Sequence, residues 1–106
     1  MKKITLIILL VFIVKSFFAQ DKGECISGDC ENGRGVYKTW AGYTYTGYFK
    51  NGKYNGPGFY DMLDGNYYEG SFKDGKFDGY GVRVFSADAC GMISYIGFFK
   101  NGRKHG

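Results

Sequence analysis

Residues 45–58 read YTGYFKNGKYNGPG, and residues 68–81, which begin 23 positions later, read YEGSFKDGKFDGYG. A third copy begins at residue 95 and reads YIGFFKNGRKHG. A half-copy precedes them, because residues 33–37 (GRGVY) match residues 56–60 (GPGFY) at the same offset. Self-similarity at a fixed period of this size is typical of repeat proteins, in which each unit is one supersecondary element.

Each copy predicts a β-hairpin. The Tyr-x-Gly-x-Phe segment has the two-residue period of a strand, so Tyr45, Gly47 and Phe49 share one face. An Asn-Gly or Asp-Gly pair follows in every copy, and both residues of such a pair accept the positive φ angles of a type I′ turn. Asp64-Gly65 is expected to form a second turn between copies, and the glycine between two aromatic residues leaves room for a ring against the backbone. Because one hairpin cannot bury its aromatic face alone, the sequence predicts an all-β fold, an elongated single-layer antiparallel meander of stacked β-hairpins.

The full pattern, Tyr-x-Gly-x-Phe-x-x-Gly-x-x-x-Gly-x-Gly, resembles the MORN repeat. It is complete in the first two copies and shortened in the third, and the resemblance covers residues 36–106, with a partial unit before residue 45. The resemblance implies a groove lined by aromatic rings, no cofactor and no catalytic activity. It also implies protein–protein contacts or scaffolding, with membrane phospholipid association as the alternative.

Residues 1–19 resemble a secretory signal peptide. Two lysines precede an apolar run from Ile4 to Val14, in which Thr5 is the one polar residue, and a polar segment begins after Ala19. The run is shorter than an ordinary transmembrane helix and Lys15 interrupts it, so cleavage after Ala19 is expected, with an uncleaved membrane anchor as the alternative. We therefore expect an N-terminal signal helix and an exported, periplasmic or extracellular, bacterial protein.

The formal net charge of +4 overstates the basicity of the predicted domain. Three of the 14 basic residues lie within the first 19 positions, so 11 Lys and Arg face 10 Asp and Glu in the remainder. A nearly neutral domain argues against nucleic acid as a partner. The one basic cluster, Lys100, Arg103 and Lys104, is interpreted as a solvated chain end.

Residues 20–35 are interpreted as an N-terminal cap that contains a cysteine pair. Cys25 and Cys30 predict a disulfide in an exported protein, and two free thiols or a metal pair remain as alternatives. Zinc needs about four ligands, and the single histidine, His105, lies far along the chain. Cys90 falls within a longer insertion and is free, buried or paired between chains.

No constellation of residues indicates catalysis. Gly33-x-Gly35 and its repeats lack the helix and the Lys-Ser pair of a phosphate loop. The segment 61–66 lacks the remaining ligands of a calcium loop and is interpreted as a turn. Glu69 has no acidic equivalent in the other copies, so the repeat offers no carboxylate pair for sugar hydrolysis.

The aromatic residues are the candidates for binding. Six of them repeat on one strand face and form either the core of the sheet or a contact row: Tyr45, Phe49, Tyr68, Phe72, Tyr95 and Phe99. Three others face the opposite way and are the better contact candidates, because the core needs them less: Tyr48, Tyr67 and Phe98. A lipid surface would instead use the cations near the turns, which are Lys50, Lys73, Lys76, Lys100, Arg103 and Lys104. The open sheet edges predict end-to-end self-association.

Overall fold

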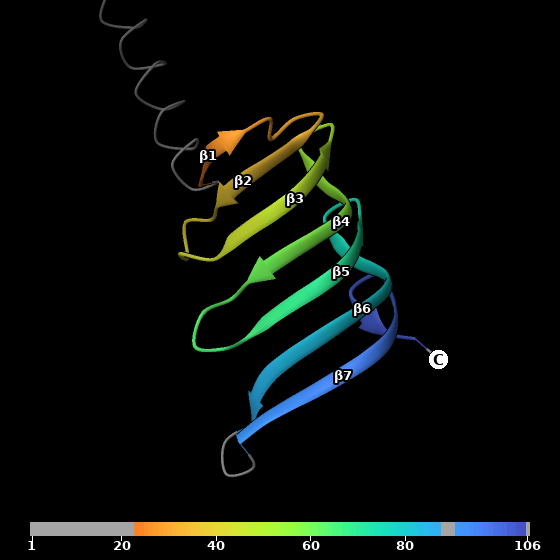
Figure 1. Ribbon diagram of the computed structural model, residues 1–106. Coiled ribbons are helices and arrows are strands. Elements are labelled where there is room, and N and C mark those ends of the chain that lie inside the picture. The colour runs from red at the N-terminus through yellow and green to blue at the C-terminus, as the bar shows by residue number, and fades with distance from the viewer. Residues whose placement is uncertain (1–22, 88–90, 106) are drawn as a thin grey trace, which may run out of the picture.

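The computed structural model describes residues 23–87 and 91–105, so the expected signal helix and Cys90 lie outside the described residues. The chain forms one antiparallel sheet in which every strand pairs with the next one in sequence (Figure 1). Its strands are β1 (Glu24–Gly28), β2 (Arg34–Lys38), β3 (Thr44–Lys50), β4 (Lys53–Asp61), β5 (Tyr67–Lys73), β6 (Lys76–Ala87), β7 (Gly91–Lys100) and β8 (Arg103–Lys104). The predicted all-β, single-layer meander is confirmed.

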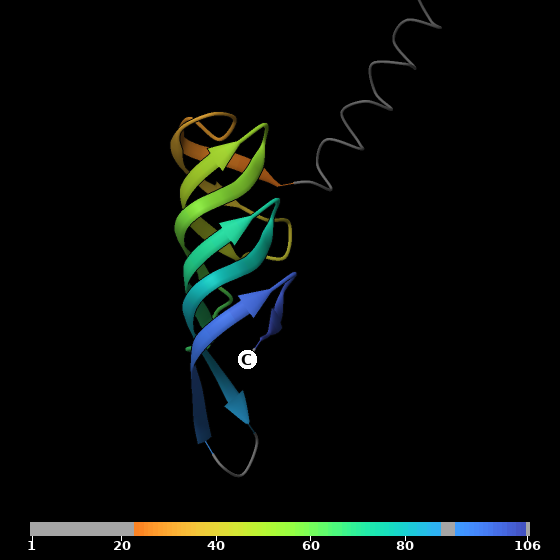
Figure 2. The same ribbon diagram turned by 90° about the vertical axis from the view of Figure 1, so that its right-hand side faces the viewer.

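Three tight turns join β3 to β4, β5 to β6 and β7 to β8. Both central residues of each turn have positive φ, for example 52° at Asn51 and 76° at Gly52, as the type I′ prediction requires. The glycine amides then bond to the preceding unit: Gly52 donates to the Glu31 carbonyl at 3.0 Å and Gly75 to the Tyr54 carbonyl at 2.9 Å. The turns therefore stack along one side of the curved sheet (Figure 2).

Each hairpin bends shortly after its turn. On β3, Gly47 pairs with Gly58 and Phe49 pairs with Tyr54, so β4 carries extra residues between these pairs. Gly56 absorbs them with a φ of 97°, a conformation that a side chain opposes. β5 and β6 repeat the irregularity between Gly70 and Phe72, and the bends turn the aromatic face of the sheet inward.

The core consists of rings that lie on backbone glycines. Tyr45 is fully buried, and its hydroxyl donates to the Tyr48 carbonyl at 2.8 Å. A Cβ atom on Gly58 would approach the Tyr45 hydroxyl oxygen to 2.5 Å, which shows that this ring occupies the space of the missing side chain. Tyr68 donates to the Ser71 carbonyl in the same way, also at 2.8 Å. The predicted packing of a ring against the repeat glycines is confirmed.

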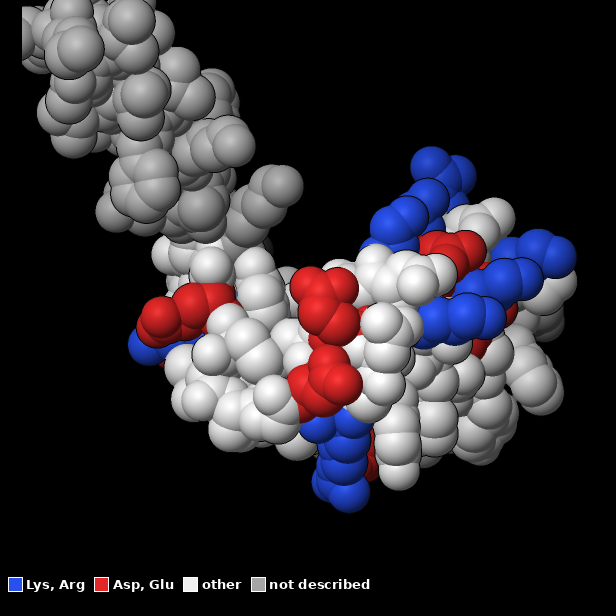
Figure 3. All heavy atoms as spheres, turned by 90° about the horizontal axis from the view of Figure 1, so that it is seen from above, with Lys and Arg blue, Asp and Glu red and all other residues white. Residues whose placement is uncertain are grey.

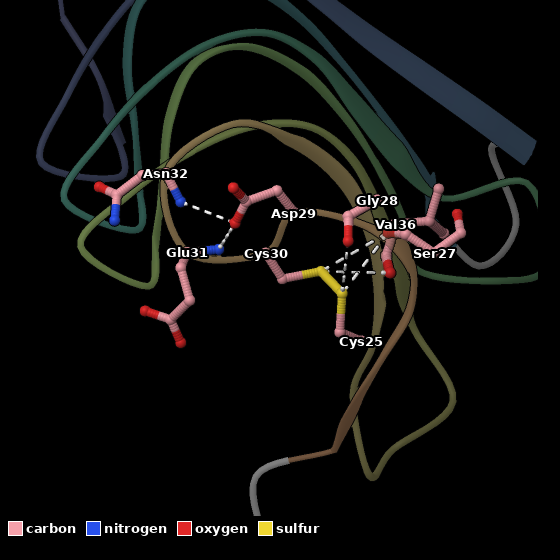
Figure 4. Close-up of a disulfide and its surroundings, with 8 residues drawn as sticks. All are labelled: Cys25, Ser27, Gly28, Asp29, Cys30, Glu31, Asn32 and Val36. Atoms are coloured by element: carbon pink, nitrogen blue, oxygen red, sulfur yellow. Dashed lines mark hydrogen bonds between the residues drawn. A yellow bond between two sulfur atoms is a disulfide. The ribbon is translucent and has the colours of Figure 1, made fainter.

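A disulfide closes the β1 end of the sheet. Cys25 and Cys30 are bonded, as predicted, so the two free thiols and the metal pair are excluded as descriptions of this structure. The Asp29 carboxylate accepts hydrogen bonds from the Glu31 and Asn32 amides, at 2.9 and 3.0 Å, and orders the loop that leads to β2 (Figure 4). These two bonds, with Asn32 first, lower the pKa of Asp29.

Candidate interaction surfaces

The inner face of the sheet is a continuous aromatic ladder. Tyr45 stacks on Tyr54 with ring centroids 3.9 Å apart, and Tyr68 stacks on Phe77 at the same distance. Edge contacts of 5.0 Å join successive units, from Tyr45 to Phe72 and from Tyr68 to Phe99. Five of the six repeat-face rings are buried, and Tyr95 is half-buried, so these rings form the core.

Burial also controls the ionisation of the inner tyrosines. Desolvation raises the pKa of Tyr45 and of Tyr68 to about 12, against an ordinary value of 10.0, although each hydroxyl donates to a backbone carbonyl. Burial, followed by the neighbouring phenols of Tyr60 and Tyr37, also raises the pKa of Tyr54. The phenols of Tyr45 and Tyr68 are neutral at physiological pH and donate hydrogen bonds to backbone carbonyls.

The inner face opens into a hollow beside the disulfide. Tyr37, Phe49 and Tyr54 form its aromatic wall, and the carboxylates of Glu24 and Glu31 lie at its border. A separate, smaller hollow lies at the opposite end of the inner face, between β6 and β8. The hollow at the β1 end is thus bordered by acidic residues, whereas the hollow at the β8 end is lined by Arg83 and Lys104.

The outer face carries the three contact candidates, but it does not bring them together. Tyr48 on β3 is 46% exposed and borders a shallow hollow with Pro57. Tyr67 on β5 is half-buried and stacks on Phe59 with centroids 5.3 Å apart. Phe98 on β7 is 57% exposed and lies strands away from both.

Phe98 instead belongs to an apolar patch that the sequence analysis missed. It pairs across the strands with Tyr80, and Val82 pairs with Ile96 beside them. Tyr80 and Phe98 make an edge contact with centroids 5.4 Å apart, yet each is 57% exposed, and Ile96 is 62% exposed. We call Tyr80, Val82, Ile96 and Phe98 the β6–β7 patch. The available signal was the position of Tyr80 next to Gly81, the inward-facing glycine that packs on the Tyr68 ring.

Charged residues gather near the turns. The strand pairing places Lys50 opposite Lys53, Lys73 opposite Lys76 and Lys100 opposite Arg103. Seen from the β1 end, most of the visible Lys and Arg side chains lie toward one side, with Asp and Glu side chains among them (Figure 3). The resulting field is mixed in sign, in agreement with the nearly neutral composition.

The remaining sequence candidates have ordinary structural positions. Gly35, Gly58 and Gly81 are strand residues that pair with neighbouring strands, and His105 is exposed after β8. Asp61 accepts the Leu63 amide within the predicted turn, at 2.9 Å. Within residues 23–87 and 91–105, no three His, Cys, Asp or Glu side chains cluster as metal ligands would.

The part of the chain that the structure describes holds no helix long and apolar enough to cross a membrane.

Comparison with known families agrees with the repeat geometry. A family model described as the MORN repeat matches residues 45–67, 68–87 and 95–106, just over half of the chain. No curated protein matches the chain.

Proposed function

Because the chain belongs to the MORN repeat family, whose repeats generally serve as protein- or membrane-interaction modules, we propose that it is a non-enzymatic binding module for a protein partner. The β6–β7 patch is the observation that carries this proposal. Its rings lie on the outer face, where the core does not need them, and they remain more than half exposed. Contiguous exposed apolar groups of this kind mark interaction sites, and tyrosine and phenylalanine are favoured as interface anchors.

The patch has the energetic capacity for specific binding. Each large side chain that becomes fully buried contributes about 1.5–3 kcal/mol, so three such residues supply several kcal/mol before the costs of association. Tyr80 and Phe98 already contact each other, so little side-chain freedom is lost when a partner covers them.

Site-specific photo-cross-linking in the organism that encodes the chain tests this function. A photoreactive phenylalanine analogue at Phe98 or Tyr80 is expected to give a discrete protein adduct. The matched control is the same analogue at Lys38, which is exposed on the outer face of β2. Equal adducts from Phe98 and Lys38, or no adduct from Phe98 and Tyr80, would contradict the proposal.

We further propose that the module works outside the cytoplasm, in the cell envelope or beyond it. The leader-like residues 1–19 and the Cys25–Cys30 disulfide support this location, because disulfides persist mainly in oxidising compartments. Protection of an epitope tag from protease in cells whose outer envelope is permeabilised and whose cytoplasmic membrane is intact would argue against it.

Membrane-surface association is the second candidate, and the paired cations at the three turns favour it. Like charges directly opposite each other destabilise a sheet, so three such pairs suggest a role in contacting anions. Co-sedimentation with anionic and neutral vesicles at two salt concentrations separates the candidates. Salt-sensitive pelleting with anionic vesicles alone would support the membrane, whereas a protein that stays in the supernatant leaves the β6–β7 patch as the binding surface.

A further inference from the structure

The last unit of the repeat departs from the earlier ones at two inner-face positions. Tyr54 stacks on Tyr45 in the first unit and Phe77 stacks on Tyr68 in the second, but the equivalent residue of the third unit is Lys104. Its ammonium nitrogen lies over the Tyr95 ring, 4.9 Å from the centroid. A cation thus replaces the stacked ring.

The second departure is Arg83. The strand pairing aligns one row of inner-face residues across the sheet, namely Tyr37, Tyr45, Tyr60, Tyr68, Arg83 and Tyr95. Arg83 interrupts the tyrosines that occupy this row from β2 to β7, and it stands 23 residues after Tyr60. One guanidinium nitrogen, Nη1, donates to the Tyr67 and Val84 carbonyls, which anchors the side chain on the sheet.

The fold brings these two cations to the same place. Arg83 and Lys104 lie on one ring, with the guanidinium carbon 5.3 Å and the ammonium nitrogen 5.7 Å from the centroid of Phe85. Both line the hollow between β6 and β8, together with Phe77, Phe85 and Phe99. Among the described residues, no acidic side chain lines this hollow.

Arg83 and Lys104 carry like charges, and no carboxylate of the described residues lines the hollow between them, so their mutual repulsion is an uncompensated cost there. Burial lowers the pKa of Arg83. An anion bound between the two side chains would relieve this cost. The Nη2 and Nε donors of Arg83 make no hydrogen bond to the residues that the structure describes, and a guanidinium presents such donors in a geometry that matches carboxylate and phosphate.

We propose that the hollow formed by Arg83, Lys104 and the rings of Phe77, Phe85 and Phe99 binds a carboxylate or phosphate that is carried on an aromatic or aliphatic body. The two cations hold the anionic group and the three rings hold the apolar body. This site is on the inner face and does not depend on the β6–β7 patch, so either proposal can fail without the other.

Titration of the isotope-labelled full-length chain with phenyl phosphate and with benzoate tests the site by NMR. Saturable shifts of the Arg83 side-chain N–H and of the Phe85 and Tyr95 ring signals are expected, with a dissociation constant on the order of 1 mM for ligands of this size. Benzyl alcohol has the same ring without the charge and should bind at least tenfold more weakly. If phenyl phosphate binds more tightly than benzoate, the natural ligand is a phosphate; the reverse order identifies it as a carboxylate.

The repeat itself supplies variants that preserve the fold. Arg83→Tyr and Lys104→Phe restore the residue types of the equivalent positions, so both should fold, and each should weaken anion binding at least tenfold. Arg103→Gln removes the same charge from the neighbouring, exposed position of β8 and should change affinity less than twofold. Absence of saturable shifts in the unaltered chain, equal binding of benzyl alcohol, or an equal loss in Arg103→Gln would overturn the proposal.

Discussion

Replacing Gly58 by alanine should destabilise the sheet far more than an added methyl group usually does. The new Cβ would lie 2.5 Å from the Tyr45 hydroxyl oxygen and 2.7 Å from its ring carbon Cζ, about 1 Å inside normal contact. Tyr45 has no room to retreat. It is fully buried, stacked on Tyr54 at 3.9 Å and in edge contact with Phe72 at 5.0 Å.

The magnitude follows from the two ways in which the structure can respond. Overpacking that shifts the backbone typically costs about 1–3 kcal/mol. Expelling the Tyr45 ring would forfeit about 1.5–3 kcal/mol of burial, together with about 1 kcal/mol for its hydrogen bond to the Tyr48 carbonyl. Alanine also lowers the conformational entropy of the unfolded chain, which offsets about 0.5–1 kcal/mol of this loss in stability. The severe overlap places the overpacking cost near the upper end of its range, so we expect a net loss of about 2 kcal/mol, which lowers the melting temperature by roughly 8–16 °C in a domain of this size.

Urea and thermal unfolding, followed by circular dichroism, measure this change. Gly97→Ala is the matched control, because its Cβ would meet the equivalent Tyr95 ring at 2.8 Å in the last unit. That ring is half-buried and can swing outward, so the control should lose about 1 kcal/mol or less. A loss below 0.5 kcal/mol for Gly58→Ala, on the order of an exposed-site change, or equal losses for both variants, would refute the reasoning.

Four further predictions follow from other parts of the structure. Asp74→Ala, at a turn position with a φ of 51°, should destabilise the hairpin by about 1–2 kcal/mol, whereas Asp74→Asn should be neutral; urea unfolding compares them. Reduction of the Cys25–Cys30 disulfide, or replacement of both residues by serine, removes a cross-link that contributes about 2 kcal/mol for so short a loop. Amide hydrogen exchange should then become faster in β1, whereas β5 and β6 should stay protected. Burial raises the pKa of Tyr45 and Tyr68 to about 12, so their contribution to stability is complete below pH 10.0 and is lost as the pH rises toward 12. Absorbance titration of the folded chain should show a fraction of the tyrosines that ionises only well above pH 10. A single ionisation step near pH 10 would contradict this prediction. The outer edge of β1 pairs with no strand among the described residues, so end-to-end dimers are expected at high concentration, and a purely monomeric mass by light scattering would count against them.

The hairpin geometry followed from local rules in the sequence. Asn51-Gly52 specified a two-residue turn because few residue pairs tolerate two positive φ angles in succession. Alternation assigned Tyr45 and Phe49 to one shared face but left open whether that face is the core or a contact row, and their burial shows that it is the core. The disulfide was also predicted, since Cys25 and Cys30 are close in sequence and the compartment was inferred from the leader.

The position of the insertion before the third copy was predicted from the sequence, but the structure of this insertion was not. The extra residues lengthen β6 and β7, whose pairing continues to Phe85 with Ile93 and beyond. Period and composition did not distinguish a longer hairpin from a loop, because both connect the same two repeat units.

The sequence by itself therefore determined the strands, the turns and which rings share a strand face, because each depends on residues a few positions apart. Only the tertiary structure decided which surface is open and which charges meet. Tyr80 and Phe98 become one exposed patch because β6 pairs with β7 and, within residues 23–87 and 91–105, no second layer covers their outer face. Arg83 and Lys104 converge on Phe85 because the curved sheet brings β8 back over the inner face, and no local pattern in the chain records that distance.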